Sequence, residues 1–374
     1  MVSKNDRIMK QIHALIVMLM MASVAFTGCV SDDGDDTNVD DTVDPVGEET
    51  TSTLDTVIAR GSLKCGVKDS QYGMGYLEAD GTYTGLDIEY CKAVAAAIGV
   101  DTIEYVLATG SNRFELLASE EIDVLIRTTT WTTSRDADLN ADFAGINFYD
   151  GQGILVNTDA YATAPTSAMD LDGAKICVGI GTTTEGNIAD YFAVNNMEYT
   201  AVNSDDAATA KAQFEDGSCD AWTGDMSAMV AQKFGLDTTA VPNSAIMPEL
   251  LSKEPLAAAT RDNDDDWNDV VTWVWFGMLT AEELGITSAN YADANMSIPA
   301  NDRLLNNNLG LGTEANPLSA TWMQSVLAAV GNYEEAYTES FCTYDDSGSC
   351  LIDRAGSQNA PYWEGGLQYA PPMR

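Results

Sequence analysis

Cationic residues are scarce in this sequence. Its 374 residues include 18 lysines and arginines against 58 aspartates and glutamates, which gives a formal net charge of −40. Nucleic acids and anionic lipid surfaces are bound through a cationic face that displaces counterions, and this composition does not supply one. We therefore exclude DNA, RNA and electrostatic membrane binding. The same negative excess suits a protein that stays soluble in concentrated salt.

Histidine is almost absent. The single histidine, His13, lies in an N-terminal stretch that we interpret below as a removable signal. Without another histidine, the chain cannot form a Ser-His-Asp or Cys-His catalytic site or a histidine-based metal site. The sequence also has no CxxC pair, and a zinc site would need closely spaced ligands. We expect no metal and no cofactor, and most hydrolase functions are excluded.

The N-terminal apolar run is too short to span a membrane. It extends from Ile12 to Phe26, whereas a spanning helix needs roughly 20 apolar residues. A cationic start, this apolar run and small residues at its end are typical of an export signal. The run ends in "FTGC", which resembles a lipoprotein processing site. We predict a signal peptide over residues 1–28 and a lipid on Cys29, with an uncleaved anchor as the alternative.

An acidic stretch follows the predicted lipidation site. Residues 30–53 contain nine aspartates or glutamates and no lysine or arginine. Such a segment cannot bury apolar surface and repels itself, so we predict a disordered linker over residues 29–53. With a lipid on Cys29, the folded part would be tethered to the outer face of the cytoplasmic membrane.

Six cysteines remain once Cys29 is set aside. They form three couples of neighbours along the chain: Cys65 with Cys91, Cys177 with Cys219, and Cys342 with Cys350. An exported chain meets oxidising surroundings, which favours disulfides. Buried free thiols are the alternative, and the sequence leaves the connectivity open.

Strands and helices alternate in two series after the linker. The first is strand 62–67, helix 85–99, strand 102–108, helix 111–122 and strand 123–126. The second is strand 174–180, helix 183–196, strand 198–202, helix 205–217 and strand 219–224. This alternation predicts two α/β lobes, each with a mainly parallel sheet covered on both faces.

The chain should pass between the lobes twice, at residues 147–157 and 247–261. Two crossings make a hinge, and ligand sites prefer the cleft between domains. The predicted domains are 54–147 for the first segment of lobe 1, 148–248 for lobe 2, and 249–374 for the return to lobe 1 and a C-terminal extension.

The stretch "RTTTWTTSRD", residues 127–136, offers groups for an anionic ligand. The guanidinium of Arg135 can hold a carboxylate with two parallel hydrogen bonds, beside the hydroxyls of Thr128 and Thr130. A surface salt bridge from Arg135 to Asp136 or Asp138 is the alternative.

Two further sites could contribute polar groups. Thr182 and Glu185 have the spacing of a helix capping box. A glycine turn into a helix N-terminus also offers free backbone N–H groups that suit a carboxylate. Asp225, at the end of a strand, could accept an ammonium group, with a solvated loop carboxylate as the alternative.

From Leu54 to Arg374 the chain resembles the polar or general amino-acid-binding proteins of ABC uptake transporters, which are solute-binding proteins of family 3 with the type II periplasmic-binding fold. The motifs that carry this resemblance are "LDTVIARGSLKCGV", "GLDIEYCKAVAAAIG", "RTTTWTTSRD", "FYDGQGILV", "VGIGTTTEGNIADYF", "SKEPLAAATR", "AEELGITSAN" and "GGLQYAPPMR". Similar proteins also carry cysteine at the positions of Cys65, Cys91, Cys177 and Cys219.

The resemblance implies that Arg135 and Thr183 bind the ligand carboxylate and that Asp225 binds its α-ammonium. It further implies ligand contacts from Thr128 and Thr130 in the first lobe, and Tyr72 or Tyr76 would line the side-chain pocket. Thr182, at the helix start, is a further candidate for ligand binding. A glutamate or aspartate ligand would need an additional cation, for which Arg113 or Lys68 could serve. Arg127 is either such a ligand cation or a structural arginine.

The predicted function is therefore capture of a polar L-amino acid, or of several, and delivery to the permease of an ABC transporter. We expect a tethered monomer that performs no chemistry. The alternatives are a cyclohexadienyl-dehydratase-like enzyme on the same fold, in which a cleft carboxylate acts as acid or base, and a tethered amino-acid sensor.

Overall fold

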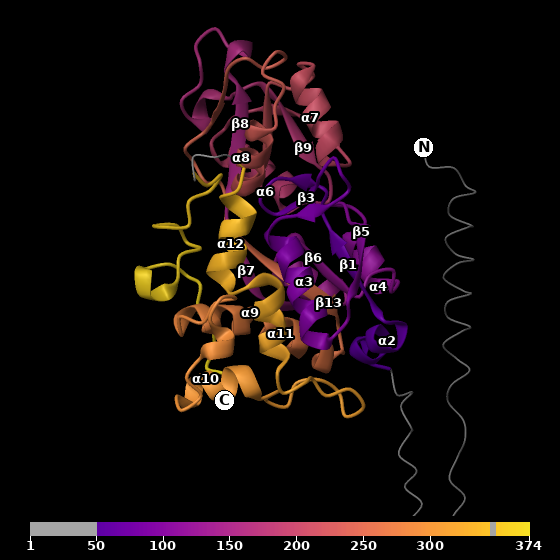
Figure 1. The fold of residues 1–374 in the computed structure, drawn as a ribbon. Helices are drawn as coiled ribbons and strands as arrows, with labels where there is room; N and C mark the ends of the chain where they lie inside the picture. Colours follow the sequence, from indigo (N-terminus) through magenta and orange to yellow (C-terminus); the bar gives the residue numbers. More distant parts are fainter. Residues whose placement is uncertain (1–50, 345–348) are drawn as a thin grey trace, which may run out of the picture. The chain divides into compact units, whose positions relative to one another are not determined.

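The computed structural model describes residues 51–344 and 349–374. The predicted signal peptide, the lipid on Cys29 and most of the predicted linker lie outside these residues. No helix among the described residues is both long enough and apolar enough to cross a membrane. The described residues form two five-stranded sheets and one small three-stranded sheet (Figure 1).

The first large sheet has the strand order β5-β1-β6-β13-β7 and is the centre of lobe 1. Its strands are β1 (Ser62–Val67), β5 (Thr102–Leu107), β6 (Val124–Thr130), β7 (Ala141–Asp150) and β13 (Glu254–Arg261). The second has the order β10-β9-β11-β8-β12 and is the centre of lobe 2. Its strands are β8 (Gln152–Asn157), β9 (Ala174–Gly179), β10 (Tyr199–Ser204), β11 (Ala221–Asp225) and β12 (Ser244–Ile246).

Each large sheet is mixed, because two of its four strand pairings are antiparallel, although four of its five strands run in one direction. Strand β1 runs parallel to β5 and β6, but β13 runs antiparallel to β6 and β7. Likewise β9 is parallel to β10 and β11, whereas β8 is antiparallel to β11 and β12. The single strand that runs against the other four is β13 in the first sheet and β8 in the second, and each of them brings the chain into its lobe. In the first sheet β7 carries the chain out of lobe 1 and the neighbouring β13 brings it back, so these two strands run in opposite directions.

The remaining elements surround these sheets. The helices are α2 (Thr53–Arg60), α3 (Leu86–Ile98), α4 (Arg113–Ala118), α5 (Thr133–Asp138), α6 (Thr183–Val194), α7 (Ala207–Glu215), α8 (Met226–Phe234), α9 (Asp265–Glu283), α10 (Pro299–Asn306), α11 (Trp322–Val330) and α12 (Tyr333–Phe341). Short 3₁₀ turns occupy Thr158–Ala160, Ala168–Asp170, Tyr291–Asp293 and Tyr362–Glu364. The small antiparallel sheet consists of β2 (Ser70–Gln71), β3 (Gly75–Leu77) and β4 (Tyr83–Thr84).

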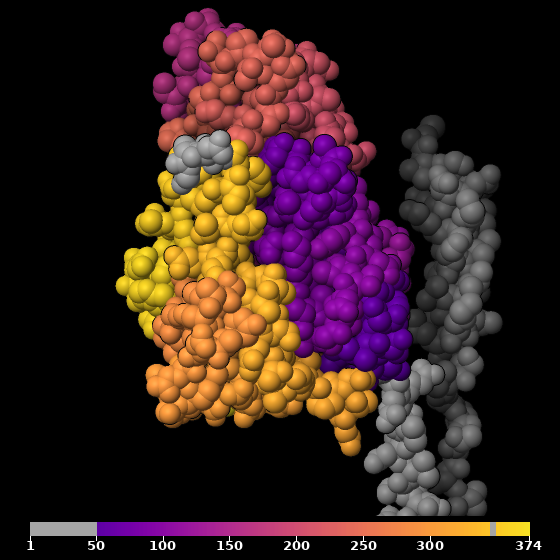
Figure 2. Space-filling model, viewed as in Figure 1, coloured from indigo at the N-terminus to yellow at the C-terminus, as the bar shows by residue number. Residues whose placement is uncertain are grey.

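The largest apolar core belongs to lobe 1. It includes three fully buried tryptophans, Trp267, Trp275 and Trp322, from α9 and α11. The C-terminal part of the chain, yellow in Figure 2, lies beside the first segment of lobe 1, in indigo. In lobe 2, the neighbouring β9 residues Ile176 and Cys177 belong to separate apolar clusters. Because successive strand side chains point to opposite faces, this places a core on each face of the second sheet.

The structure confirms the prediction of disulfides and settles their pairing. Cys65 of β1 is bonded to Cys91 of α3, and Cys177 of β9 is bonded to Cys219 just before β11. Cys342 and Cys350 close a short loop after α12. The first bond joins α3 to the first sheet, and the second joins β9 to the segment before β11. Each restricts the unfolded chain by closing a loop, because the bonded cysteines are 26 and 42 residues apart in the sequence.

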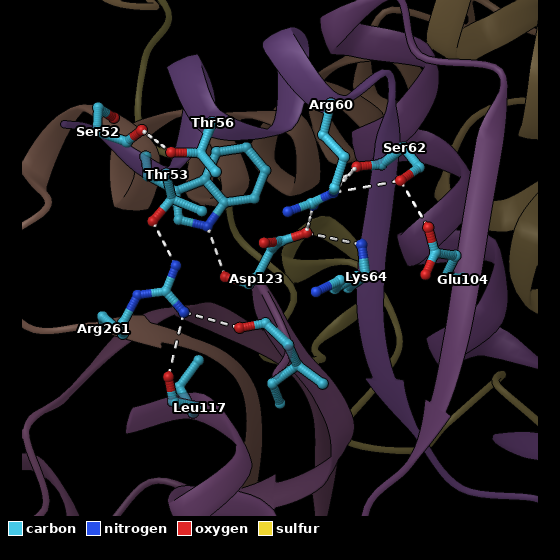
Figure 3. A network of polar contacts seen from close by, with 12 residues as sticks. Ser52, Thr53, Thr56, Arg60, Ser62, Lys64, Glu104, Leu117, Asp123 and Arg261 are labelled. Atoms are coloured by element: carbon cyan, nitrogen blue, oxygen red, sulfur yellow. Dashed lines mark hydrogen bonds and ion pairs between the residues drawn. The ribbon is translucent and has the colours of Figure 1, made fainter. Parts of the chain in front are cut away.

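The start of the folded chain is fastened to lobe 1 by polar contacts (Figure 3). Ser52 caps α2, and Asp264 accepts hydrogen bonds from the Thr53 N–H at 2.7 Å and the Ser52 hydroxyl at 2.9 Å. Arg261 donates to the Thr53 hydroxyl at 2.6 Å. The predicted linker, which ran to residue 53, is therefore too long, because a side chain of lobe 1 binds both Ser52 and Thr53.

The chain crosses between the sheets at Gly151 and over residues 247–253, within the two predicted stretches. Strand β7 stays in the first sheet as far as Asp150, slightly beyond the expected boundary, and the domain bounds themselves stay a prediction. A Cβ on Gly151 would lie 2.9 Å from the carbonyl oxygen of Ser252. Glycine is thus needed because the two crossings pass very close to each other.

Candidate ligand-binding site

A cavity of about 110 Å³ lies between the two lobes. In lobe 1 its wall includes Lys68 after β1 and Thr130 at the end of β6. In lobe 2 it includes Gly179 at the end of β9, Ser204 at the end of β10 and Asp225 at the end of β11. The carboxyl ends of strands from both sheets thus meet at one place, which is where open α/β sheets bind ligands.

Several direct contacts between the lobes surround this cavity. The Gln71 amide donates to the Ser227 hydroxyl at 3.0 Å, and the Gln232 amide donates to the Ser70 carbonyl at 2.9 Å. The lobes also meet at Gly110, where a Cβ would lie 2.7 Å from the Ile180 carbonyl oxygen. The lobes are therefore closed on each other.

Three cationic side chains contribute to the cavity wall: Lys68, Arg113 and Arg127. Arg113 is 2% exposed and Arg127 is 8% exposed. Burial lowers the pKa of Lys68 to about 8 and that of Arg127 to about 10. Burial, and then the charges of Arg127 and Arg135, also lower the pKa of Arg113 well below its usual value. The site therefore concentrates positive charge in a protein that has little of it.

Polar atoms of this wall lack partners within the described part of the chain. They are the Nε atoms of Arg113 and Arg127 and the hydroxyl oxygen of Thr128. Arg113 donates one long hydrogen bond, of 3.4 Å, to the Gly181 carbonyl. A buried guanidinium without an anion is costly, so this arrangement favours an anionic ligand.

Asp225 is the acidic group of the wall that the sequence predicts as an ammonium site. Burial raises its pKa, while Lys68, Arg127 and Arg113 act in the opposite direction. Asp205 and Asp206 also belong to the wall but are exposed. The inner wall thus has three cations and one carboxylate.

Thr128 has an unusual backbone conformation. Its φ angle is +36°, which is rare for a β-branched residue and costs conformational energy. Its N–H donates to Asp87 at 2.9 Å, and Asn147 donates to the other oxygen of this buried carboxyl at 3.1 Å. Burial raises the pKa of Asp87 to about 6. The strained residue lies between Arg127 and the end of β6, at the cavity wall.

The structure does not place Arg135 in the cavity wall. The side chain is 7% exposed, and its Nη1 donates to the Thr130 carbonyl at 2.8 Å. Its guanidinium carbon lies 5.7 Å from the centre of the Phe114 ring. It forms no ion pair with Asp136 or Asp138, which was the alternative. Its role in carboxylate binding stays a prediction.

The predicted threonines all line the cavity, with different partners. Thr182 caps α6 by accepting from the Glu185 N–H at 3.2 Å, and Glu185 accepts from the Gly181 N–H at 3.0 Å. The hydroxyls of Thr130 and Thr183 both donate to Glu254, at 2.6 and 2.8 Å. Their partner is thus a protein carboxylate in this structure.

Tyr72 and Tyr76 are not part of the cavity wall. Their rings stack on each other with centroids 3.8 Å apart. Tyr72 also meets the edges of Phe234, at 5.2 Å, and Tyr344, at 5.4 Å. The two tyrosines therefore belong to an aromatic contact between lobe 1 and α8 of lobe 2, and their role in the side-chain pocket stays a prediction.

Sequence reasoning missed other polar residues around the cavity. Gln71 and Gln232 link the lobes, and Glu254 binds hydroxyls of both. A lone glutamine or glutamate in a loop or at a strand start carries no pattern that predicts this. The sequence gives a weak indication for Lys68, because this residue directly follows the first predicted strand and the end of a strand lies at the edge of the sheet.

Comparison with known proteins identifies the family. A model of bacterial extracellular solute-binding proteins, family 3, matches residues 63–293. The chain belongs to this family. Within it, this solute-binding protein is 42% identical over 335 residues to the glutamate/glutamine/aspartate/asparagine-binding protein BztA of Rhodobacter capsulatus, which covers 88% of this chain and 95% of the relative.

Two further proteins resemble this solute-binding protein over most of their length. The general L-amino acid-binding periplasmic protein AapJ of Rhizobium johnstonii is 39% identical over 328 residues, 86% of this chain and 93% of the relative. A periplasmic binding protein from Brucella ovis, solved with glutathione bound, has a TM-score of 0.78 and 40% identity, covering 87% of this chain and all of that one (100%). The two-lobed periplasmic-binding fold expected from the sequence is confirmed.

Proposed function

We propose that this solute-binding protein captures an acidic L-amino acid, glutamate or aspartate, and delivers it to the permease of an ABC transporter. The carrying observation is the charge of the inner wall: Lys68, Arg113 and Arg127 against Asp225. One ammonium and one carboxylate, which every amino acid has, would use Asp225 and one cation. The remaining cations match a second carboxylate on the ligand.

The relatives support the transport role. The Rhodobacter protein is named for glutamate, glutamine, aspartate and asparagine, and the Rhizobium protein for L-amino acids in general. Glutathione, bound to the Brucella protein, is a peptide with two carboxylates and one ammonium, so it presents a charge pattern like that of glutamate.

Calorimetric titration of the protein from residue 51 onward with each of the twenty L-amino acids and with glutathione tests this proposal. We expect glutamate or aspartate to bind most tightly, their amides more weakly and cationic amino acids not at all. A preference for arginine or lysine would overturn the acidic assignment, and no binding by any ligand to folded protein would overturn amino-acid capture.

Binding without chemistry is part of the proposal. The family and the relatives are described as binding proteins. Proton NMR of glutamate incubated with the protein should show unchanged ligand. Conversion of a prephenate-type substrate would instead support the dehydratase-like alternative.

The proposed location is the outer face of the cytoplasmic membrane, with a lipid on Cys29 as the tether, and the proposed state is a monomer. The support is the "FTGC" pattern after a short apolar run. Mass spectrometry of the mature N-terminus would detect a lipid on Cys29, and light scattering would measure the oligomeric state. A mature chain that retains residues 1–28 would refute the lipoprotein assignment.

A further inference from the structure

Glu254 is a buried carboxylate with an unusual set of partners. It is the first residue of β13 and is 1% exposed. Its Oε2 accepts hydrogen bonds from the hydroxyls of Thr130 at 2.6 Å and Thr183 at 2.8 Å. Its Oε1 accepts from the Asn187 amide at 2.9 Å and from the Ser252 hydroxyl. All donors are side chains, so the carboxylate is well satisfied without a ligand.

These donors come from both lobes and from the crossing between them. Thr130 ends β6 of lobe 1, whereas Thr183 and Asn187 lie one turn apart on α6 of lobe 2. Ser252 belongs to the second crossing. When the lobes separate, α6 must move away from β6, so Glu254 cannot keep the donors of both lobes at these distances.

The charge environment of Glu254 explains why a carboxylate is tolerated here. Arg135, which does not line the cavity, is buried close by, and Glu254 is the acidic group that most opposes the lowering of the Arg135 pKa by burial. The two side chains form no ion pair, but both bind Thr130, Arg135 its carbonyl and Glu254 its hydroxyl, so the opposite charges lie near each other. Charge-assisted hydrogen bonds are stronger than neutral ones, so the closed arrangement gains from each lobe 2 donor that reaches Glu254.

We propose that Glu254 is a clasp that stabilises the closed lobes by binding Thr183 and Asn187, and thereby sets ligand affinity without being part of the cavity wall. This inference rests on the proposed function only in assuming that the lobes close around a ligand. A protein that is already closed for part of the time binds more tightly, because less of the binding free energy is used to close it. Glu254 is thus a positioning residue.

Small-angle X-ray scattering of the ligand-free protein tests the clasp directly. Glu254→Gln keeps the shape of the side chain but replaces one acceptor oxygen by an N–H₂ group, so either the two threonine hydroxyls or the Asn187 amide lose the oxygen that accepts from them, and in both cases a lobe 2 donor loses its acceptor. We expect a larger radius of gyration than in the wild type. Asn187→Ala removes a lobe 2 donor outside the cavity wall and should have the same effect, which keeps the test valid if the first variant folds poorly.

Ligand kinetics provide the second measurement. With glutamate as the probe, both variants should dissociate about tenfold faster with little change in association, because closure follows encounter. The double variant should be no weaker than Glu254→Gln alone, because both changes remove the same interaction. Additive effects would overturn the clasp. So would a wild type that is fully open without ligand, or variants with the radius of gyration of the wild type.

Failure of the clasp proposal can be distinguished from failure of the acidic-ligand proposal. The scattering measurement needs no ligand, so it stands even if no amino acid binds. If glutamate does not bind but the variants open, the acidic-ligand proposal fails and the clasp holds. If glutamate binds equally to all variants and none opens, the clasp proposal fails and the acidic-ligand proposal holds.

Discussion

Arg127 makes no side-chain hydrogen bond or ion pair within the described residues, although it is 8% exposed. The sequence left it either as a ligand cation or as a structural arginine. A structural arginine would hold a partner inside the protein, as Arg60 does with Asp123. Arg127 instead belongs to the cavity wall, which favours the ligand role.

Arg127→Gln should therefore change affinity and stability in opposite directions. Loss of a buried charge partner should weaken glutamate binding by about 2–5 kcal/mol. The ligand-free protein should be as stable as the wild type or more stable, because an unpaired buried cation is removed. Calorimetry and thermal unfolding would measure the two effects. Arg60→Gln is the control and should lower stability but not affinity. Equal glutamate affinity in Arg127→Gln and the wild type would contradict the ligand role.

Asp150, at the first crossing, has a pKa raised from 3.8 to about 7 by burial and then by Asp225. Between roughly pH 4 and pH 7 the folded protein holds a proton that the unfolded chain releases. Stability from this group is thus present at low pH and falls as the pH rises to about 7. Asp150→Asn should remove this slope, which is at most about 1.4 kcal/mol per pH unit.

Denaturant unfolding of the ligand-free protein at several pH values measures this effect. The stability of Asp150→Asn relative to the wild type should increase from about pH 4 to pH 7 and then level off. Gly151, whose N–H donates to Asp150 at 2.8 Å, would retain an acceptor in the variant. A constant difference across this range would show that Asp150 titrates as in the unfolded chain.

Part of the cavity wall consists of residues that the sequence analysis singles out. Thr130 is predicted from the threonine-rich stretch 127–136, Asp225 from a strand end and Thr183 from the family resemblance, and all three line the cavity, while their contacts with a ligand stay a prediction. The choice between Arg113 and Arg135 could not be made from the sequence. Both belong to short helices near strand ends, and only the tertiary packing determines which guanidinium reaches the cavity.

At the scale of elements, the contact between the lobes depends on close backbone approach at Gly110. A Cβ there would lie 2.7 Å from the Ile180 carbonyl oxygen of the other lobe, and backbone cannot move aside as a flexible side chain can. Gly110→Ala should therefore obstruct closure and weaken ligand affinity at least tenfold. Thermal stability should change little, since the clash exists only when the lobes meet.

The matched control is Gly186→Ala on α6, where a Cβ would contact nothing within 4 Å. This variant should bind normally and gain roughly 0.5–1 kcal/mol of helix stability. Calorimetry and thermal unfolding on both variants separate the effects. If Gly110→Ala binds as tightly as the wild type, the lobes do not need this approach for ligand capture.

The order of helices and strands was largely predictable, because apolar periodicity and glycine stops are local. Helix α3, for example, ends at Ile98 and is capped by Gly99, whose φ of +73° is left-handed. The antiparallel direction of β13 was not predictable from local pattern. The chain returns from lobe 2 to lobe 1 as β13, which pairs antiparallel with β6 and β7. Glu254 is the first residue of β13, so its position and its role follow from this return.

At the scale of the whole molecule, negative charge is mostly unpaired. Four ion pairs join cations to carboxylates in the described part of the chain, whereas the sequence has a formal net charge of −40. Repulsion among these carboxylates destabilises the compact state. Salt shortens the distance over which they interact, from about 10 Å at 0.1 M to about 3 Å at 1 M.

The midpoint of thermal unfolding at pH 7 should consequently rise between about 0.1 M and 1 M sodium chloride, most steeply at the low end. The same titration near pH 4 is the internal control. This pH is close to the ordinary pKa values of aspartate and glutamate, about 3.9 and 4.3, so many of these side chains are protonated. Part of the repulsion is then already removed, and the rise in the unfolding midpoint should be smaller. An equal rise at both pH values would assign the effect to general salt action on apolar burial rather than to charge.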